Sequence, residues 1–361
     1  MPSDPDHSIH VPDVLSELVA GRTLGERDAD ALFEALLSGS LAEAQIGALL
    51  ALLQARGPTA DELVGAARAM RRHVARVPVP EIPGAVVIDT CGTGGAPKTF
   101  NVSTAAAIVA AAIEPPRGSG VSRILVAKHG NRSRTGRGSA EVLQALGVDV
   151  DCAPEVQARC LARAGVCFCF AIHHHPAMRH AAAARRALGF PTIFNLLGPL
   201  TNPAGASRQL IGVARAEHVP LVAEALRRLG AERAIVMHGT DDGGGPGLDE
   251  FTLTGPTGYA ELAGGAVTHR SVAPAALGLA SAVFADLAVE SVEASAELVR
   301  GILTGAERGA KTEMVLLSAG AAGVVAGAAG SLAEGLSLAR EAIESGRAAE
   351  TLARLVEASR G

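Results

Sequence analysis

Apolar residues in the first 80 positions recur at helical spacing, without the strict alternation that is typical of half-buried strands. The spacing predicts helices at 11–19, 24–37, 41–55 and 61–77. Thr59 is an expected N-terminal cap, and the proline-rich stretch 77–83 excludes a further helix. We therefore predict a small helical domain over residues 1–80, joined by helices from about 176–200, and a domain boundary at the prolines.

From residue 85 onward, short apolar runs alternate with segments of helical periodicity. Strands are predicted at 86–88, 123–127, 166–172, 210–213 and 234–238. Helices are predicted between them at 104–113, 139–146, 176–188 and 217–229, and then at 290–303, 313–326, 331–345 and 348–359. This alternation indicates an α/β domain over residues 81–361, with a mainly parallel central sheet flanked by helices.

A glycine-rich turn follows the first predicted strand. The turn is Gly92-Thr-Gly-Gly95, and Asn101-Val-Ser-Thr104 precedes the apolar run 105–113, where a Ser or Thr would cap the helix. A strand, a glycine loop and a helix N-terminus together suit a phosphate group. An ordinary tight β–α turn is the alternative, because the stretch lacks both common nucleotide-binding spacings.

Composition restricts which partners are plausible. The chain has 361 residues, a formal net charge of −5, no Trp and one Tyr, so a general basic field and base-stacking platforms for nucleic acid are missing. An anionic ligand would need local cations. Lys128, Arg132, Arg134 and Arg137 fall within ten residues after a predicted strand, which predicts a focused positive site; a solvated basic loop is the alternative.

Cysteine usage favours a reducing compartment. The chain has five cysteines, an odd number, and none of them forms a C-x-x-C pair. Cys167 and Cys169 lie in a predicted buried strand, where they are expected to be small core residues. No apolar stretch reaches the length of a membrane span. We expect a cytoplasmic protein with reduced thiols and no membrane association.

Two further clusters carry candidate chemistry. His173, His174 and His175 would point to alternating sides of an extended chain, which argues against a shared metal, and His175 is an expected cap for helix 176–188. Arg185 on that helix suits a carboxylate ligand, or is a surface arginine. Asp249 and Glu250 suit Mg²⁺ that a substrate phosphate also holds, with a solvated acidic turn as the alternative.

Taken together, the motifs resemble those of the anthranilate phosphoribosyltransferases of tryptophan synthesis, in family order across nearly the whole chain. They are Gly92–Gly95 with 99–104, Lys128-His-Gly-Asn-Arg-Ser133 with 138–140, His175-Pro-Ala-Met178, the run 192–203, and Gly247-Leu-Asp-Glu250. The resemblance implies a homodimer in which the small helical domain is hinged to the α/β domain, with substrates in the cleft between them.

The resemblance also implies roles for individual residues. The phosphoribosyl pyrophosphate donor would be bound by Gly92, Gly95, Thr99, Asn101, Val102, Ser103, Thr104, Lys128 and Ser139. Anthranilate would be bound by Gly92, Asn131, His175 and Arg185. Two Mg²⁺ ions per subunit would be bound by Ser103, Asp249 and Glu250. An aromatic amine is neutral and already nucleophilic, so no single acid or base is nominated; Lys128 and Arg132 would stabilise charge.

The chain departs from the family pattern at three places. Ala96-Pro97 replaces the usual Asp-Gly after the glycines, the segment 134–137 is shorter and poorer in Ser, and residues 241–246 are extra. Two other functions stay open on the sequence alone: a pyrimidine-nucleoside phosphorylase of similar fold, and a nucleic-acid-binding relative without the chemistry. The run 195–203 disfavours the first, and the acidic balance disfavours the second.

Overall fold

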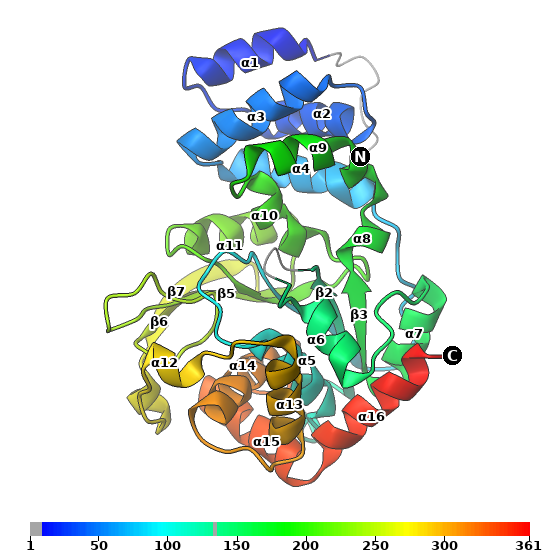
Figure 1. Ribbon diagram of the computed structural model, residues 1–361, viewed down its shortest axis with the longest axis vertical. Coiled ribbons are helices and arrows are strands. Elements are labelled where there is room, and N and C mark those ends of the chain that lie inside the picture. Colours follow the sequence, from blue (N-terminus) through cyan, green and yellow to red (C-terminus); the bar gives the residue numbers. More distant parts are fainter. Residues whose placement is uncertain (1–8, 133–135) are drawn as a thin grey trace.

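The computed structural model describes residues 9–132 and 136–361. A bundle of helices lies at one end of the molecule, above a sheet with helices on its faces (Figure 1). Ser133, Arg134 and Thr135, which belong to the predicted basic segment, lie outside the described residues. Within the described ranges, no helix combines the length and the apolar character that crossing a membrane requires.

The helical bundle begins with four helices, and two later helices pack against them. They are α1 (Val11–Val19), α2 (Glu26–Leu37), α3 (Glu43–Arg56) and α4 (Ala60–Arg72), joined by α9 (Arg179–Leu188) and α10 (Ile193–Leu197). Thr59 caps α4 as expected, because its side chain accepts from the Glu62 N–H while the Glu62 carboxylate accepts from the Thr59 N–H. The helix ends before the predicted residue 77. Instead, the Ala75 N–H donates to the His174 carbonyl at 2.9 Å.

The sheet has seven strands in the order β3-β2-β1-β4-β5-β6-β7. The first five in this order are parallel, and the last two are antiparallel, which confirms the predicted α/β class with a mainly parallel sheet. The strands are β1 (Ala85–Gly92), β2 (Arg123–Gly130), β3 (Val166–Phe170), β4 (Arg208–Gly212), β5 (Arg233–Gly239), β6 (Thr257–Ala263) and β7 (Ala266–Val272).

Two hydrophobic clusters cover the two faces of the sheet. One joins the sheet to α5 (Val102–Ala112) and α14 (Ala310–Ala326), and the other joins it to α11 (His218–Arg228) and the helical bundle. The remaining elements are α6 (Ser139–Leu146), α7 (Pro154–Ala164), α8 (Ala171–His174), α12 (Phe284–Leu287), α13 (Val292–Leu303), α15 (Leu332–Glu344), α16 (Arg347–Ser359), and the 3₁₀ turns η1 (Pro176–Met178), η2 (Gly198–Thr201) and η3 (Pro274–Leu277). The bundle therefore shares apolar packing with the sheet.

Strand order fixes where a ligand site belongs. The chain runs from β1 outward to β2 and β3, then returns across the sheet to β4 and β5 on the other side of β1. Connections thus diverge between β1 and β4, and ligands of such sheets bind at the carboxyl ends of the strands beside this divergence. The last residues paired there are Gly92 and Gly212.

Several local predictions are wrong at their boundaries. Helix α5 begins at Val102 after Asn101, and no side-chain cap is formed there, whereas Ser or Thr was expected to cap a helix from 104. Strand β3 ends at Phe170 because residues 171–174 form a helical turn. The helix predicted at 176–188 is a 3₁₀ turn followed by α9. The sequence reading missed α7 and the hairpin of β6 and β7.

Candidate active site

Two glycines form the floor of the site at the divergence of the sheet. A Cβ at Gly212 would lie 1.7 Å from the backbone oxygen of Asp249, and a Cβ at Gly92 would lie 3.2 Å from its carboxylate. The segment 247–250 can therefore cross the end of β4 only because Gly212 has no side chain, and Gly92 leaves room for the Asp249 carboxylate at the end of β1. A bridge between Gly239 and Leu248 fixes the start of this segment against β5.

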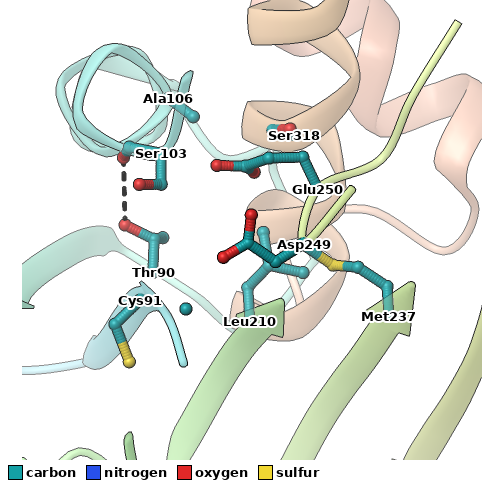
Figure 2. A pocket seen from close by; sticks show the side chains of 10 residues that line it. Thr90, Cys91, Ser103, Ala106, Leu210, Met237, Asp249, Glu250 and Ser318 are labelled. Carbon is teal, nitrogen blue, oxygen red and sulfur yellow. Dashed lines mark hydrogen bonds between the residues drawn. The ribbon is translucent and has the colours of Figure 1, made fainter. Parts of the chain in front are cut away.

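Asp249 and Glu250 place their carboxyl groups in a pocket between the sheet, α5 and α14 (Figure 2). Burial raises the pKa of Asp249, and burial together with the Asp249 carboxylate raises the pKa of Glu250 to about 8. Two carboxylates that disfavour each other's charge are well suited to a shared divalent cation. The pocket is lined by Thr90, Cys91, Gly92, Ser103, Ala106, Leu210, Met237, Asp249, Glu250 and Ser318.

Lys128 lies beside this pocket and is held in a fixed orientation. Its Nζ donates to the Thr90 carbonyl at 2.6 Å and to the Ser103 Oγ at 3.1 Å. The Thr90 hydroxyl in turn donates to the Ser103 carbonyl at 3.4 Å, a bond drawn in Figure 2. An ammonium group has three donors, so one remains for a ligand. Burial lowers the pKa of Lys128, and the Asp89 carboxylate opposes that change.

The glycine loop connects β1 to α5 with its backbone in a special conformation. Gly94 and Gly95 have φ of 64° and 100°, which L-residues with side chains rarely adopt. The Thr93 N–H donates to the Gly212 carbonyl at 2.9 Å, and this anchors the loop to β4. Val102 is the first residue of α5, so the N-terminus of that helix, with the positive end of its dipole, lies beside the loop, as an anion site requires.

Side chains around the helix starts are largely engaged with one another. The Asn101 Oδ1 accepts from Ser295 at 2.9 Å, and Thr104 donates to Ser139 at 3.0 Å, which joins the beginnings of α5 and α6. Thr99 is buried, and its carbonyl accepts from the Val289 N–H. The structure thus brings the predicted donor-binding residues to one region. Within 101–104, the Ser103 hydroxyl accepts a hydrogen bond from Lys128.

A second group of predicted residues lies toward the helical bundle. Asn131 is exposed just beyond β2, and Arg185 on α9 places its guanidinium over the Phe194 ring, 5.2 Å from the centroid. The Nε2 atoms of His175 and His129 are 3.1 Å apart, so His175 does not cap a helix as expected. Burial lowers the pKa of His129 to about 3 and that of His175 to about 4, so both imidazoles are neutral near pH 7.

The predicted basic cluster is not gathered at one point. Lys128 faces Thr90 and Ser103, whereas the Arg132 guanidinium lies over the Phe170 ring at 5.4 Å from its centroid. Arg137 donates to the Val289 carbonyl at 2.6 Å and so fixes a loop. Of these three described cations, Lys128 is the one beside the carboxylate pocket.

The three adjacent histidines are not on an extended chain, because residues 171–174 form the helical turn α8. His173 contacts the Asp151 carboxylate at 2.9 Å, and His174 contacts the Ala75 carbonyl at 2.7 Å. The expected alternation was therefore the wrong reason for separating them. Each of the three histidines contacts a different partner, because successive residues of a helical turn point in different directions.

Sequence reasoning missed Asp89, Asn202 and Ser318. Asp89 and Asn202 are buried and joined by a hydrogen bond of 2.8 Å across 113 positions of the chain. Ser318 lies on α14 in an apolar, Ala-rich helix, and its buried hydroxyl has no hydrogen-bond partner in the structure. No periodic or motif signal links these residues to the site, although Asn202 falls in the run 192–203.

Comparison with known proteins agrees with this architecture. Residues 12–74 match the helical bundle domain of a glycosyl transferase family, and residues 84–349 match its α/β domain. A relative named anthranilate phosphoribosyltransferase from Rubrobacter xylanophilus is 49% identical over 350 residues, which covers 96% of this chain and 97% of the relative. One of the same name from Rhodospirillum rubrum is 46% identical over 358 residues, which covers 99% and 98%.

Solved structures show the same fold. A crystal structure of anthranilate phosphoribosyltransferase from Thermus thermophilus matches with a TM-score of 0.86 at 40% identity, covering 97% of this chain and 100% of the other. The Saccharomyces cerevisiae enzyme in complex with PRPP and Mg matches with a TM-score of 0.83 at 24% identity, covering 97% and 98%, and supports the fold. Both domains, their order and nearly the full length agree, and we conclude that the chain belongs to the anthranilate phosphoribosyltransferase family.

Proposed function

We propose that this chain transfers the phosphoribosyl group from 5-phosphoribosyl 1-pyrophosphate to the amine of anthranilate, with release of pyrophosphate, as a step of tryptophan biosynthesis. One observation carries the proposal. A carboxylate pair, a fixed lysine and the N-terminus of α5 converge at the divergence of the sheet. This combination suits a pyrophosphate leaving group, because the lysine, the helix N-terminus and a cation held by the carboxylates would stabilise its negative charge.

The donor occupies the carboxyl edge of the sheet. Gly92, Gly95 and the positive end of α5 face its phosphates, and the remaining Lys128 donor stabilises the charge that grows on the leaving group. Thr99, Asn101, Val102, Thr104 and Ser139 shape the same helix ends. Arg132 lies further away, over Phe170, so its role in charge stabilisation requires a different rotamer.

The carboxylate pocket fits Mg²⁺. Ser103, Asp249 and Glu250 supply the oxygen ligands that this ion prefers, and we propose two ions per subunit held by these residues and the donor. Among residues 9–132 and 136–361, no cluster of three or more His, Cys, Asp or Glu is placed to hold a metal alone. The ions therefore need donor oxygens to complete their coordination. Bound Mg²⁺ supplies neutralisation of the developing pyrophosphate charge.

Anthranilate occupies the side toward the helical bundle. The Arg185 guanidinium, which lies over the Phe194 ring, binds the anthranilate carboxylate. Asn131 and His175 orient the anthranilate ring so that its amine faces the sugar of the donor. The aromatic amine needs no strong base, and both nearby imidazoles are neutral. Positioning supplies the acceleration on this side.

The assembly and location are also proposals. We propose a homodimer, with a helical domain over residues 1–80 joined by α9 and α10, hinged to the domain over residues 81–361; the shared apolar cluster around α9 and α10 supports this grouping. All five cysteines are described, and none forms a disulfide, which supports a cytoplasmic location.

The direct test follows anthranilate fluorescence after the chain is mixed with donor and Mg²⁺. The signal is expected to fall as product forms, and chelation of the metal should stop it. No change in fluorescence would contradict the proposal. Phosphorolysis of thymidine or uridine in place of transfer would assign the chain to nucleoside phosphorolysis instead.

Arg185→Ala separates the two substrates. The variant should raise the anthranilate KM by about tenfold or more while the donor KM changes little, because only the carboxylate partner is lost. Steady-state kinetics with each substrate varied in turn measure both values. Arg186→Ala on the same helix is the matched control, and a larger effect on the donor KM would reverse the assignment.

A further inference from the structure

The sheet splits between β1 and β2 at its carboxyl edge. Their pairing runs from Ala85 with Arg123 to Ile88 with Val126 and then stops. On the outer sides, β2 stays paired with β3 as far as Gly130, and β1 stays paired with β4 as far as Gly92. The last four residues of each strand, 89–92 of β1 and 127–130 of β2, are therefore not paired with each other.

Side chains replace the missing ladder bonds across this split. The Asp89 Oδ1 accepts from the His129 N–H at 3.0 Å, and the Asn202 Nδ2 donates to the Ala127 carbonyl at 2.8 Å. In the other direction, Lys128 donates to the Thr90 carbonyl at 2.6 Å. Backbone groups that a closed ladder would pair are thus satisfied by three side chains, as buried backbone requires.

Asp89 and Asn202 are also bonded to each other. The Asn202 Nδ2 donates to the Asp89 Oδ2 at 2.8 Å, and the Asn202 Oδ1 accepts from the Ala204 N–H at 2.9 Å. Asp89 is 0% exposed and Asn202 is 7% exposed. Burying a carboxylate is costly, and a closed β1–β2 ladder with an apolar residue at position 89 would avoid that cost. The pair therefore satisfies the backbone of the split at a desolvation cost that a closed ladder would not carry.

The bridge also connects the sheet with the segment that returns from the helical bundle. Asn202 follows η2, whose Gly198 carbonyl contacts the His129 Nδ1 at 3.0 Å. The next residue, Pro203, accepts from the Val77 N–H with its carbonyl at 3.2 Å. One hydrogen-bonded unit thus joins β1, β2, η2 and the segment after α4.

We propose that Asp89 and Asn202 are positioning residues that hold β1 and β2 apart, so that Lys128 reaches the donor side and Asn131 the acceptor side of the cleft. The roles of Lys128 and Asn131 rest on the proposed function above. Neither Asp89 nor Asn202 contacts a substrate in this scheme. They act through the backbone of residues 127–131, which carries both functional side chains.

The test combines kinetics with native-state hydrogen exchange on Asp89→Asn and Asn202→Ala. Asp89→Asn keeps the shape of the side chain but turns its amide Nδ2 toward a group that donates to the carboxylate in the wild type. We expect exchange of the His129 backbone amide to accelerate by about tenfold or more while amides in the centre of β4 stay protected. The transferase kcat should fall and the anthranilate KM should rise, by about tenfold to a hundredfold in kcat/KM.

Ser359→Ala is the matched control, because it removes a buried side-chain bond to the Asp149 N–H that involves neither β1 nor β2. It should leave kcat/KM and the His129 amide unchanged although it destabilises the fold. Unchanged exchange at His129 in both test variants, or a kcat/KM loss equal to that of Ser359→Ala, would overturn the positioning role. A wild-type chain that transfers no phosphoribosyl group would overturn the proposed function alone, since exchange is measured without substrates.

Discussion

Glu250, which we propose as a Mg²⁺ ligand, also gives the protein a pH dependence. Burial and the neighbouring Asp249 raise its pKa to about 8, so the metal-free folded protein holds a proton there that the unfolded chain has released near pH 7. A group with a raised pKa in the folded state stabilises that state at low pH. This stability is full below about pH 4.5 and is lost as the pH rises through about 8.

The melting temperature of the Mg²⁺-free protein should therefore fall between pH 6 and pH 9. The fall reflects the release of about one proton from Glu250 in the folded state. Glu250→Gln should flatten that decline, and added Mg²⁺ should protect the wild type more at the higher pH, where the carboxylate is already charged. Differential scanning calorimetry across the pH series measures both. An identical pH dependence in wild type and Glu250→Gln would contradict the assignment.

Ser318 is a residue whose replacement should stabilise the protein. Its hydroxyl is buried on α14 and has no hydrogen-bond partner, which is unfavourable relative to a methyl group of similar size. Ser318→Ala should raise the free energy of unfolding by about 1 kcal/mol. Ser359→Ala, which removes a satisfied hydroxyl, should lower it by a similar amount. Chemical denaturation compares the two, and a destabilised Ser318→Ala would show that the hydroxyl bonds a pocket water.

At the scale of elements, the site depends on how closely the segment 247–250 crosses the ends of β1 and β4. Gly212→Ala would place a Cβ 1.7 Å from the Asp249 backbone oxygen, so the segment must move away. We expect transferase activity to fall by about a hundredfold, because the carboxylate pair is displaced by about 1 Å or more.

Gly258→Ala is the matched control for Gly212→Ala. Gly258 also lies in a strand, and no heavy atom lies within 4 Å of a Cβ built there. It should leave the activity within about twofold of wild type, as expected for a change that displaces no neighbour. Calorimetry of Mg²⁺-dependent donor binding should show the same contrast, and equal binding by both variants would refute the role of the crossing.

Elements with strong periodicity were predictable from the sequence, and the contacts that assemble the site were not. Helices 11–19 and 139–146 were placed at their observed bounds because apolar spacing and turn residues mark them. The hairpin of β6 and β7 was missed because its edge strand is mostly exposed and carries little apolar pattern. The sequence pattern placed Lys128 and the pair Asp249 and Glu250 in two separate candidate sites, and the family resemblance joined them with Ser103; in the structure all four lie close together. The Asp89–Asn202 bond has no local signal at all.

At the scale of the whole molecule, the helical bundle and the sheet share one apolar cluster. Leu197 and Leu200 belong to the same cluster as Leu36 of α2 and Val236 of β5. Arg71 adds polar links, since it donates to the Leu200 and Leu229 carbonyls. The helical bundle and the sheet can be told apart in outline (Figure 1), but they are stabilised by a common apolar interior.

Thermal unfolding should accordingly show one cooperative transition in which both parts unfold together. The fragment 9–80 alone should give little helical signal by circular dichroism, because α9 and α10 are missing from its interior. Two well-separated calorimetric transitions, or a stably helical fragment, would contradict the shared interior. The matched fragment 9–200 restores α9 and α10 and is expected to recover part of the helical signal.

The glycine-rich turn at 118–120 precedes β2 at the amino edge of the sheet, whereas Gly92, Gly130 and Gly212 end their strands at the carboxyl edge. The turn 118–120 therefore lies at the edge of the sheet opposite the candidate site. A reporter domain or a linker to a solid support attached at Gly118 would leave the path to the cleft open. An immobilised form of this enzyme attached through the amino edge of the sheet should thus keep its substrate access at the carboxyl edge.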